Sequence, residues 1–95
     1  MAGHRHAISD LLDLLGRRWT LRVLWELRAD PLTFGALRAA CGDMSTSVLS
    51  ERLADLREAR LVEQAGGAYG LTPTGRELLA HLAPLNAFAD RWRDG

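Results

Sequence analysis

The chain has 95 residues, 47% hydrophobic and 25% charged, and its 12 basic and 12 acidic residues give a formal net charge of zero. This length fits one domain, no apolar run is long enough to cross a membrane, and the start lacks the apolar core of a signal peptide, so we expect a soluble cytoplasmic protein. The single cysteine, Cys41, excludes an intrachain disulfide and a thiolate cage for a metal. Because a domain this small is only marginally stable alone, a partner subunit is the stabiliser that remains.

The first part of the chain predicts a flexible start and two helices. Residues 1–6 are polar and expected to be frayed. From Ala7 the apolar residues Ile8, Leu11, Leu12 and Leu15 follow helical spacing, so a helix should run from there to Gly16, with Ser9 as a candidate cap inside its start. A second helix is predicted from about residue 18 to 28, and its apolar residues cover more than one stripe, which is typical of a central buried helix.

A helix-turn-helix is predicted next. After an extended pair at residues 32–33, Thr33 can cap a short helix over residues 34–41, and Gly42 begins a tight turn. Ser45 then caps a helix over about residues 46–59, whose buried seam should be Leu49, Leu53, Leu56 and, at the exit, Leu61. Two helices joined by such a short turn containing Gly are typical of this motif.

The last third predicts a β-hairpin and a final helix. Two extended runs around Gly66-Gly67 indicate a hairpin, or wing, over about residues 61–72. Thr72-Pro73 starts a helix over about residues 73–92, which Pro84 should kink or divide. The predicted fold class is therefore mainly α with a small β-hairpin: one winged helix-turn-helix domain over residues 7–95, with added N- and C-terminal helices.

The predicted fourth helix is the candidate DNA-reading element. With its leucines buried, short hydroxyl side chains lie at its N-terminus and outer face, where such helices contact base edges and phosphates. Arg52 flanks them, and the arginines before the second helix resemble a phosphate clamp. The candidate DNA-binding residues are Arg17, Arg18, Thr20, Ser45, Thr46, Ser47, Ser50 and Arg52. The same pattern also fits a capped structural helix and a pair of surface arginines.

The terminal helices carry a candidate dimer interface. Apolar residues of the last helix repeat at spacings of four and three, as in coiled coils. These residues could pack in the core of the monomer or form an interface between two subunits. Without either kind of packing they would be an exposed apolar patch. The candidate interface residues are Ile8, Leu11, Leu12, Leu15, Leu78, Leu82, Leu85, Phe88 and Trp92.

The sequence gives little support for a metal site, a redox site or a catalytic site. His4 and His6 lie near the polar start without a third ligand, so we predict no metal site and no cofactor. Cys41 is interpreted as a small buried apolar residue rather than a redox sensor. Because the sequence contains no nucleophile motif, phosphate loop or convincing carboxylate pair, it does not predict an enzyme.

Five segments together resemble the HxlR-type regulators, a winged helix-turn-helix family of the MarR-like superfamily. The resemblance spans about residues 7–93 and is carried by residues 14–21, 34–38, 49–53, 61–63 and 69–78. It implies a bacterial transcription regulator that binds a roughly palindromic operator as a homodimer through its terminal helices. It also implies that Thr46, Ser47, Ser50 and Arg52 contact DNA bases or backbone, and that Arg17, Arg18 and Thr20 clamp phosphate.

Three positions depart from the family pattern. His6 stands where many members carry a redox cysteine, so thiol sensing is not expected. Arg60 replaces a usual glycine, which would cost about 1 kcal/mol if the backbone there is left-handed. The wing is short and has no basic residue, so its contacts with DNA would be limited to its backbone.

Two alternatives stay open beside the DNA-binding regulator. Zero net charge, the wing without basic residues and Glu51 on the outer face would also suit a winged-helix module that binds protein and not DNA. In a third hypothesis, an unknown small-molecule effector regulates DNA binding from an apolar pocket lined by Trp19, Trp25, Phe88 and Trp92.

Overall fold

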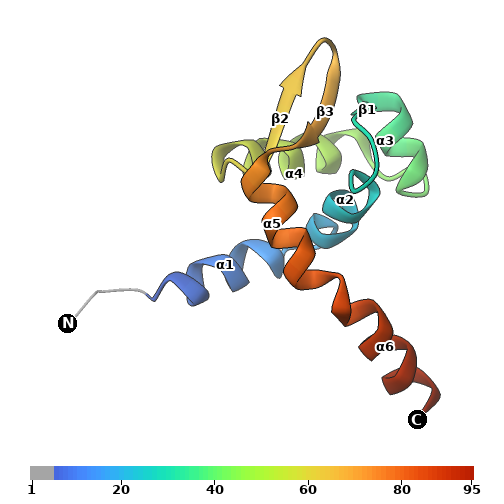
Figure 1. Cartoon of the computed structure of the whole chain (residues 1–95). Coiled ribbons are helices and arrows are strands. Elements are labelled where there is room, and N and C mark those ends of the chain that lie inside the picture. Colours follow the sequence, from blue (N-terminus) through green and yellow to red (C-terminus); the bar gives the residue numbers. More distant parts are fainter. Residues whose placement is uncertain (1–5) are drawn as a thin grey trace.

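The computed structural model describes residues 6–95, which form six helices and three strands (Figure 1). The predicted flexible start lies almost entirely outside these residues. No helix within residues 6–95 is long and apolar enough to cross a membrane. In chain order the elements are α1 (Ala7–Leu15), α2 (Thr20–Glu26), β1 (Leu32–Thr33), α3 (Phe34–Ala40), α4 (Thr46–Glu58), β2 (Val62–Ala65), β3 (Ala68–Leu71), α5 (Pro73–Leu82) and α6 (Pro84–Asp94). The predicted fold class is confirmed.

The hydrophobic core lies where α2, α3, α4 and the base of the hairpin meet. The predicted seam of α4 is confirmed, since each of its leucines is buried. Burying a leucine stabilises the fold by roughly 1.5–3 kcal/mol, so these positions fix how α4 sits on the body. The buried apolar residues are Leu15, Val23, Leu24, Leu27, Leu37, Cys41, Met44, Leu49, Leu53, Leu56, Leu61, Val62 and Leu71.

The sheet has the antiparallel order β1-β3-β2. Ala65 pairs with Ala68 across a turn in which Gly66 and Gly67 have φ angles of 58° and 80°. Two consecutive positive φ values suit a tight hairpin turn and favour glycine, so the predicted hairpin is confirmed. Leu32 of β1 pairs with Tyr69, which makes β3 the central strand.

The predicted caps are mostly confirmed. The side chains of Thr33, Ser45 and Thr72 accept backbone N–H groups at 3.2, 3.4 and 3.0 Å. The helix α1 begins at Ala7, as predicted, but the candidate cap at Ser9 was wrong: His6 is the N-cap residue and no side chain caps this helix. The second helix is also shorter than expected, because Trp19 has a left-handed backbone (φ 78°) and α2 begins only after it.

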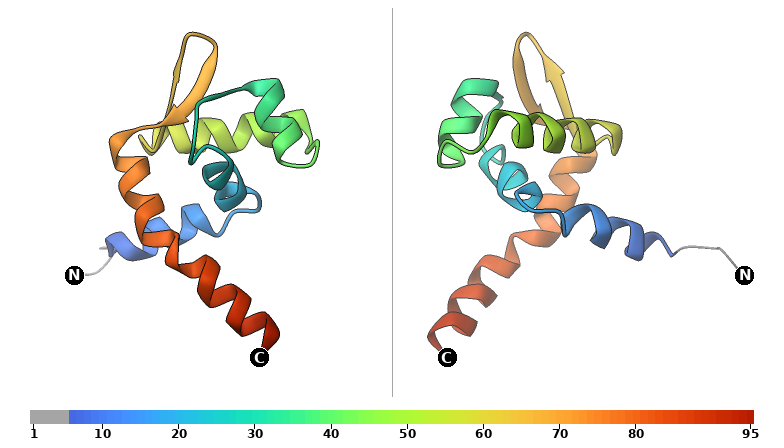
Figure 2. Two further views of the ribbon diagram at one scale, coloured as in Figure 1. Left: turned by 45° about the vertical axis from the view of Figure 1, so that its right-hand side comes forward. Right: turned by 180° about the vertical axis from the view of Figure 1, so that it is seen from behind.

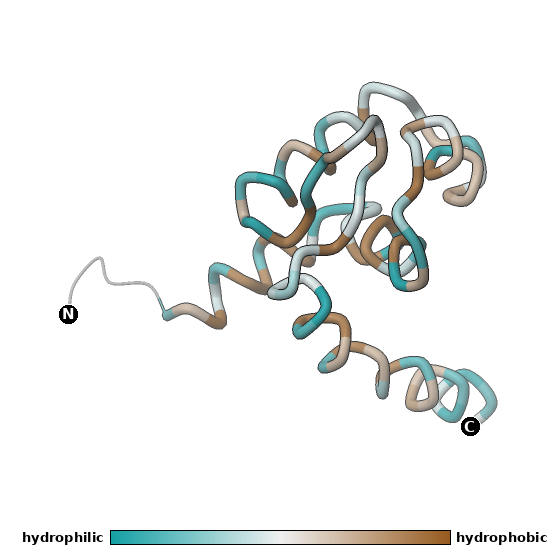
Figure 3. The backbone as a smooth tube through the Cα atoms, turned by 45° about the horizontal axis from the view of Figure 1, so that its top comes forward, coloured by the Kyte–Doolittle hydropathy of each residue, from teal (hydrophilic) through white to brown (hydrophobic). Residues whose placement is uncertain are grey.

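Two arms extend from the body at the end opposite to the hairpin (Figures 1 and 2). One is α1, and the other is α6, which continues α5 after a bend. Ala83 keeps helical angles (φ −54°, ψ −42°) and Pro84 begins α6, so Pro84 divides the predicted last helix into two parts. Along α1 and along α5 and α6, hydrophobic and hydrophilic positions alternate (Figure 3).

Candidate functional site

Two arginines hold the turn between α3 and α4. The Arg38 Nε group donates to the Met44 carbonyl at 2.7 Å, and Arg22 Nη2 donates to the Ala40 carbonyl at 2.9 Å. Hydrogen bonds to charged donors are stronger than neutral ones, so both ends of the turn are fastened. The sequence did not predict this role, because the carbonyl partners come close to the arginines only in the folded turn.

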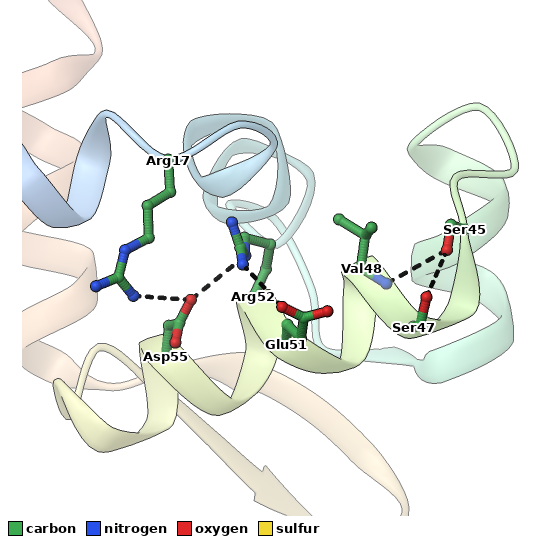
Figure 4. A network of polar contacts seen from close by, with 7 residues as sticks. All are labelled: Arg17, Ser45, Ser47, Val48, Glu51, Arg52 and Asp55. Atoms are coloured by element: carbon green, nitrogen blue, oxygen red, sulfur yellow. Dashed lines mark hydrogen bonds and ion pairs between the residues drawn. The ribbon is translucent and has the colours of Figure 1, made fainter.

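The N-terminal end of α4 presents hydroxyl groups to solvent. Ser45 caps the helix through Val48, and its Oγ lies 2.9 Å from Ser47 Oγ (Figure 4). Ser45, Thr46, Ser47 and Ser50 are all exposed, whereas the leucines of the same helix are buried. Together with the backbone N–H groups that a helix start leaves free, this surface suits anionic and hydrogen-bonding partners.

Asp55 links two of the candidate arginines (Figure 4). Its Oδ2 lies 3.0 Å from Arg17 Nη1 and 3.3 Å from Arg52 Nε. Arg52 Nη2 also lies 3.5 Å from Glu51 Oε1. The side chain of Arg17 is 49% exposed but that of Arg52 only 17%, so Arg17 is the more accessible guanidinium. Asp55 was not among the predicted site residues, although its spacing of three residues from Arg52 on a helix is typical of an ion pair.

Thr20 differs from the other candidate DNA-binding residues in being part of the core. Thr20 is fully buried, and its Oγ1 has no hydrogen-bond partner within residues 6–95. Its side chain belongs to the core and is not available to a phosphate. Arg18, by contrast, is exposed, and its guanidinium lies 5.8 Å from the centre of the Trp19 ring.

The hairpin adds little charge to this surface. Its tip, from Ala65 to Gly67, is exposed, and Glu63 is the only charged residue in the wing at residues 61–72. Only backbone groups and small side chains are available at the tip, as its sequence suggested.

The arms carry the large exposed apolar side chains of residues 6–95, apart from Leu21 of α2. Those of Ile8, Leu12, Leu85, Phe88 and Trp92 are 59%, 59%, 53%, 52% and 74% exposed. The other candidate interface residues are covered to different degrees: Leu15 is buried, and Leu11, Leu78 and Leu82 pack half-buried against the core. The apolar surface at this end of the molecule is therefore narrower than the predicted stripe.

Cys41 lies in the core, at 1% exposure. Burial raises the pKa of its thiol; the Arg22 charge opposes this effect and Glu26 adds to it. Since the thiolate is the reactive form, a buried neutral thiol fits the structural role that the sequence suggested.

Comparisons with known proteins agree with this geometry. The family model of the HxlR-like helix-turn-helix matches residues 14–95. The chain is 28% identical over 90 residues to the uncharacterised HTH-type transcriptional regulator MJ0925 of Methanocaldococcus jannaschii, a match that covers 90% of this chain and 84% of that protein.

Solved structures show the same fold. Quinone-bound YodB from Bacillus subtilis superposes with a TM-score of 0.82 and 30% identity, covering 88% of this chain and 96% of that one. A possible HxlR family transcriptional factor from Thermoplasma volcanium gives a TM-score of 0.84 and 26% identity, covering 96% of this chain and 88% of that one.

Proposed function

Since the chain belongs to the HxlR-like helix-turn-helix family and is thus a transcriptional regulator of the winged-helix type, we propose that it binds double-stranded DNA through the N-terminal half of α4. Regulators of this kind are not enzymes. The observation that carries the proposal is the exposed hydroxyl surface of Ser45, Thr46, Ser47 and Ser50 on a helix fixed by its buried leucines. In the major groove, these groups would contact base edges and phosphates.

Arg17 and Arg18 supply the phosphate contacts in this proposal. Both are exposed and precede α2, and Arg17 could exchange the Asp55 carboxylate for a DNA phosphate. Arg52 is more covered and would reach DNA only by leaving Asp55. We leave Thr20 out of the contact set because its side chain is buried. The hairpin would approach the minor groove with backbone groups alone.

We further propose that the functional unit is a homodimer joined through the arms. The helix α6 contains no buried residue although Leu85, Phe88 and Trp92 lie on it. A helix of 11 residues is only marginally stable in water without tertiary packing, so α6 needs another apolar surface to pack against. A second copy would supply the same apolar face and place two α4 helices on the halves of a palindromic operator.

Fluorescence anisotropy tests DNA binding. The purified protein is titrated onto a labelled duplex from upstream of its own gene and onto a scrambled duplex, over a salt series. We expect specific binding whose log affinity falls with log salt by roughly 0.9 per neutralised phosphate. Arg17→Ala should weaken binding and reduce this slope by about one, whereas Arg93→Ala, the same charge change on α6, should not.

The binding data also decide between DNA and protein as the partner. Absence of binding at low salt, or equal loss with Arg17→Ala and Arg93→Ala, would contradict the proposed surface. The first result would favour a protein-binding module, for which the uncharged hairpin tip and exposed Glu51 are the supporting observations.

Analytical ultracentrifugation tests the homodimer. Phe88→Asp puts a charge on the exposed face of α6 and should convert dimers to monomers. Ala65→Asp adds the same charge at the hairpin tip and should leave the mass unchanged. A monomeric wild-type protein at micromolar concentration would refute this part of the proposal.

A further inference from the structure

A pocket of about 380 Å³ lies between α2, the end of β3 and α5. Its volume falls within the range of about 300–1,000 Å³ that is usual for small-molecule sites. Trp25, Leu71 and Leu79 give it an apolar wall, and Arg28 and Arg76 line it as exposed residues. Of the four aromatic side chains that the sequence suggested for an effector pocket, only Trp25 lines this one.

Neither arginine of the pocket forms an ion pair with an acidic side chain of residues 6–95. Within residues 6–95, the ion pairs involve Arg17, Arg22 and Arg52, and neither Arg28 nor Arg76 has an acidic partner. Two unpaired guanidinium groups beside an apolar wall form a surface complementary to a molecule with one anionic end and one apolar end.

Arg28 is also held in place before any ligand arrives. Its guanidinium carbon lies 4.2 Å from the centre of the Trp25 ring, and Nη1 donates to the Trp25 carbonyl at 3.0 Å. An arginine has five N–H donors, so this bond leaves others available. Because the side chain is already ordered by stacking, less conformational entropy is lost when it binds an anion.

We propose that this pocket binds an amphipathic organic anion, a carboxylate carried on an aromatic ring. The carboxylate would accept hydrogen bonds from Arg28 and Arg76, and the ring would pack on Trp25 and Leu79. Such a ligand would touch α2, the last residue of the hairpin and the helix that leads into α6. The pocket shares no residue with the DNA contacts or the exposed apolar side chains of the arms, so this inference does not rest on the proposed function.

Isothermal titration calorimetry without DNA tests the pocket, with 2-naphthoate as the probe and 2-naphthamide as its neutral match. We expect the amide to bind at least about tenfold more weakly, because it cannot form charge-assisted hydrogen bonds. The double variant Arg28→Gln/Arg76→Gln should lose at least about tenfold in affinity for naphthoate. Arg91→Gln/Arg93→Gln removes the same charge from α6 and should change nothing.

Three results would overturn the proposal: no naphthoate binding to the wild-type protein, equal binding of acid and amide, or an equal loss in both double variants. The last would mean that net charge alone attracts the probe. Should the first double variant fail to fold by circular dichroism, Arg76→Gln alone decides, because the Arg76 side chain makes no ion pair or hydrogen bond within residues 6–95. An unchanged affinity in that variant would equally overturn the proposal.

Discussion

The Arg17 guanidinium lies 3.0 Å from the Asp55 carboxylate, and this ion pair joins the segment before α2 to the C-terminal half of α4. The same carboxylate oxygen lies 3.3 Å from Arg52. In the proposed DNA complex, Asp55 would therefore compete with a phosphate for both guanidinium groups. In the proposed complex, DNA would have to replace these ion pairs with phosphate contacts, which would lower affinity for every sequence and leave discrimination to the hydroxyl groups of α4.

Asp55→Asn should raise affinity for random DNA severalfold at low salt and narrow the difference between operator and random duplex. The substitution removes a negative charge and frees Arg17 and Arg52 for phosphates. Anisotropy titrations with both duplexes measure the effect. Glu58→Gln, which removes the same charge from the last residue of α4, is the control; a similar rise in both variants would show that only net charge matters.

Gly75→Ala should lower the free energy of unfolding by about 3 kcal/mol. A Cβ at this position would collide with the carbonyl oxygen of Leu61, where α5 packs on the base of the hairpin, and backbone cannot move aside cheaply. Urea denaturation measures the change. Gly35→Ala on α3 meets open space and should stabilise by up to about 1 kcal/mol. Equal effects of the two substitutions would refute this close approach.

Arg60→Gly should raise the free energy of unfolding by about 0.5–1 kcal/mol. Arg60 has a φ angle of 62°, so the left-handed backbone anticipated from its sequence position is present, and glycine adopts it without strain. The Arg60 carbonyl would still accept the Thr72 hydroxyl group. Arg60→Ala is the control: it removes the charge but keeps a Cβ, and therefore keeps the strain of the left-handed backbone. A gain in the alanine variant as large as in the glycine variant would rule out the backbone explanation.

Thr20→Val should stabilise the protein by about 1 kcal/mol and leave DNA affinity unchanged. The Thr20 hydroxyl is buried without a partner, and a methyl group of the same shape removes that penalty. Thermal unfolding and anisotropy provide the two readouts. Thr20→Ser keeps the hydroxyl, loses a buried methyl and should destabilise. A fall in DNA affinity with valine would return Thr20 to the phosphate clamp.

Cys41 should react with a thiol reagent such as dithionitrobenzoate at least about tenfold more slowly in the folded protein than in urea. Its side chain is buried and its thiol pKa is raised, so access and thiolate fraction are both low. Absorbance at 412 nm follows the reaction. Equal rates in both states would mean that the core opens readily around this residue.

Sequence periodicity predicted α4, the hairpin and the start of α5 because each depends on local chemistry. Caps at Ser45 and Thr72 and two glycines in the hairpin turn need no knowledge of distant residues. The start of the second helix was predicted less well, because Trp19, which packs against the core, has a left-handed backbone that is rare for a bulky residue.

The candidate site was predicted in part for the same reason. Exposure of the α4 hydroxyls follows from helical geometry alone. Three other features depend on contacts between segments far apart in sequence, so composition and spacing could not predict them. They are the burial of Thr20, the ion pair of Arg17 with Asp55, and the hydrogen bonds of the two arginines to the α3–α4 turn.

In the proposed dimer, the bend at Pro84 would help to set the distance between the two α4 helices. Proline has no N–H group to bond the preceding helical turn, and its ring clashes with a carbonyl of that turn, so Pro84 favours a bend between α5 and α6. A slip of one turn between paired helices moves them by about 5.4 Å, compared with a rise of about 3.4 Å per base pair. Small changes in how the arms pack would therefore change the distance between the two α4 helices, and with it the spacing of the operator halves, by a whole number of base pairs. The arms, at the end of the molecule opposite to the hairpin, would thus determine the length of the operator that the dimer binds.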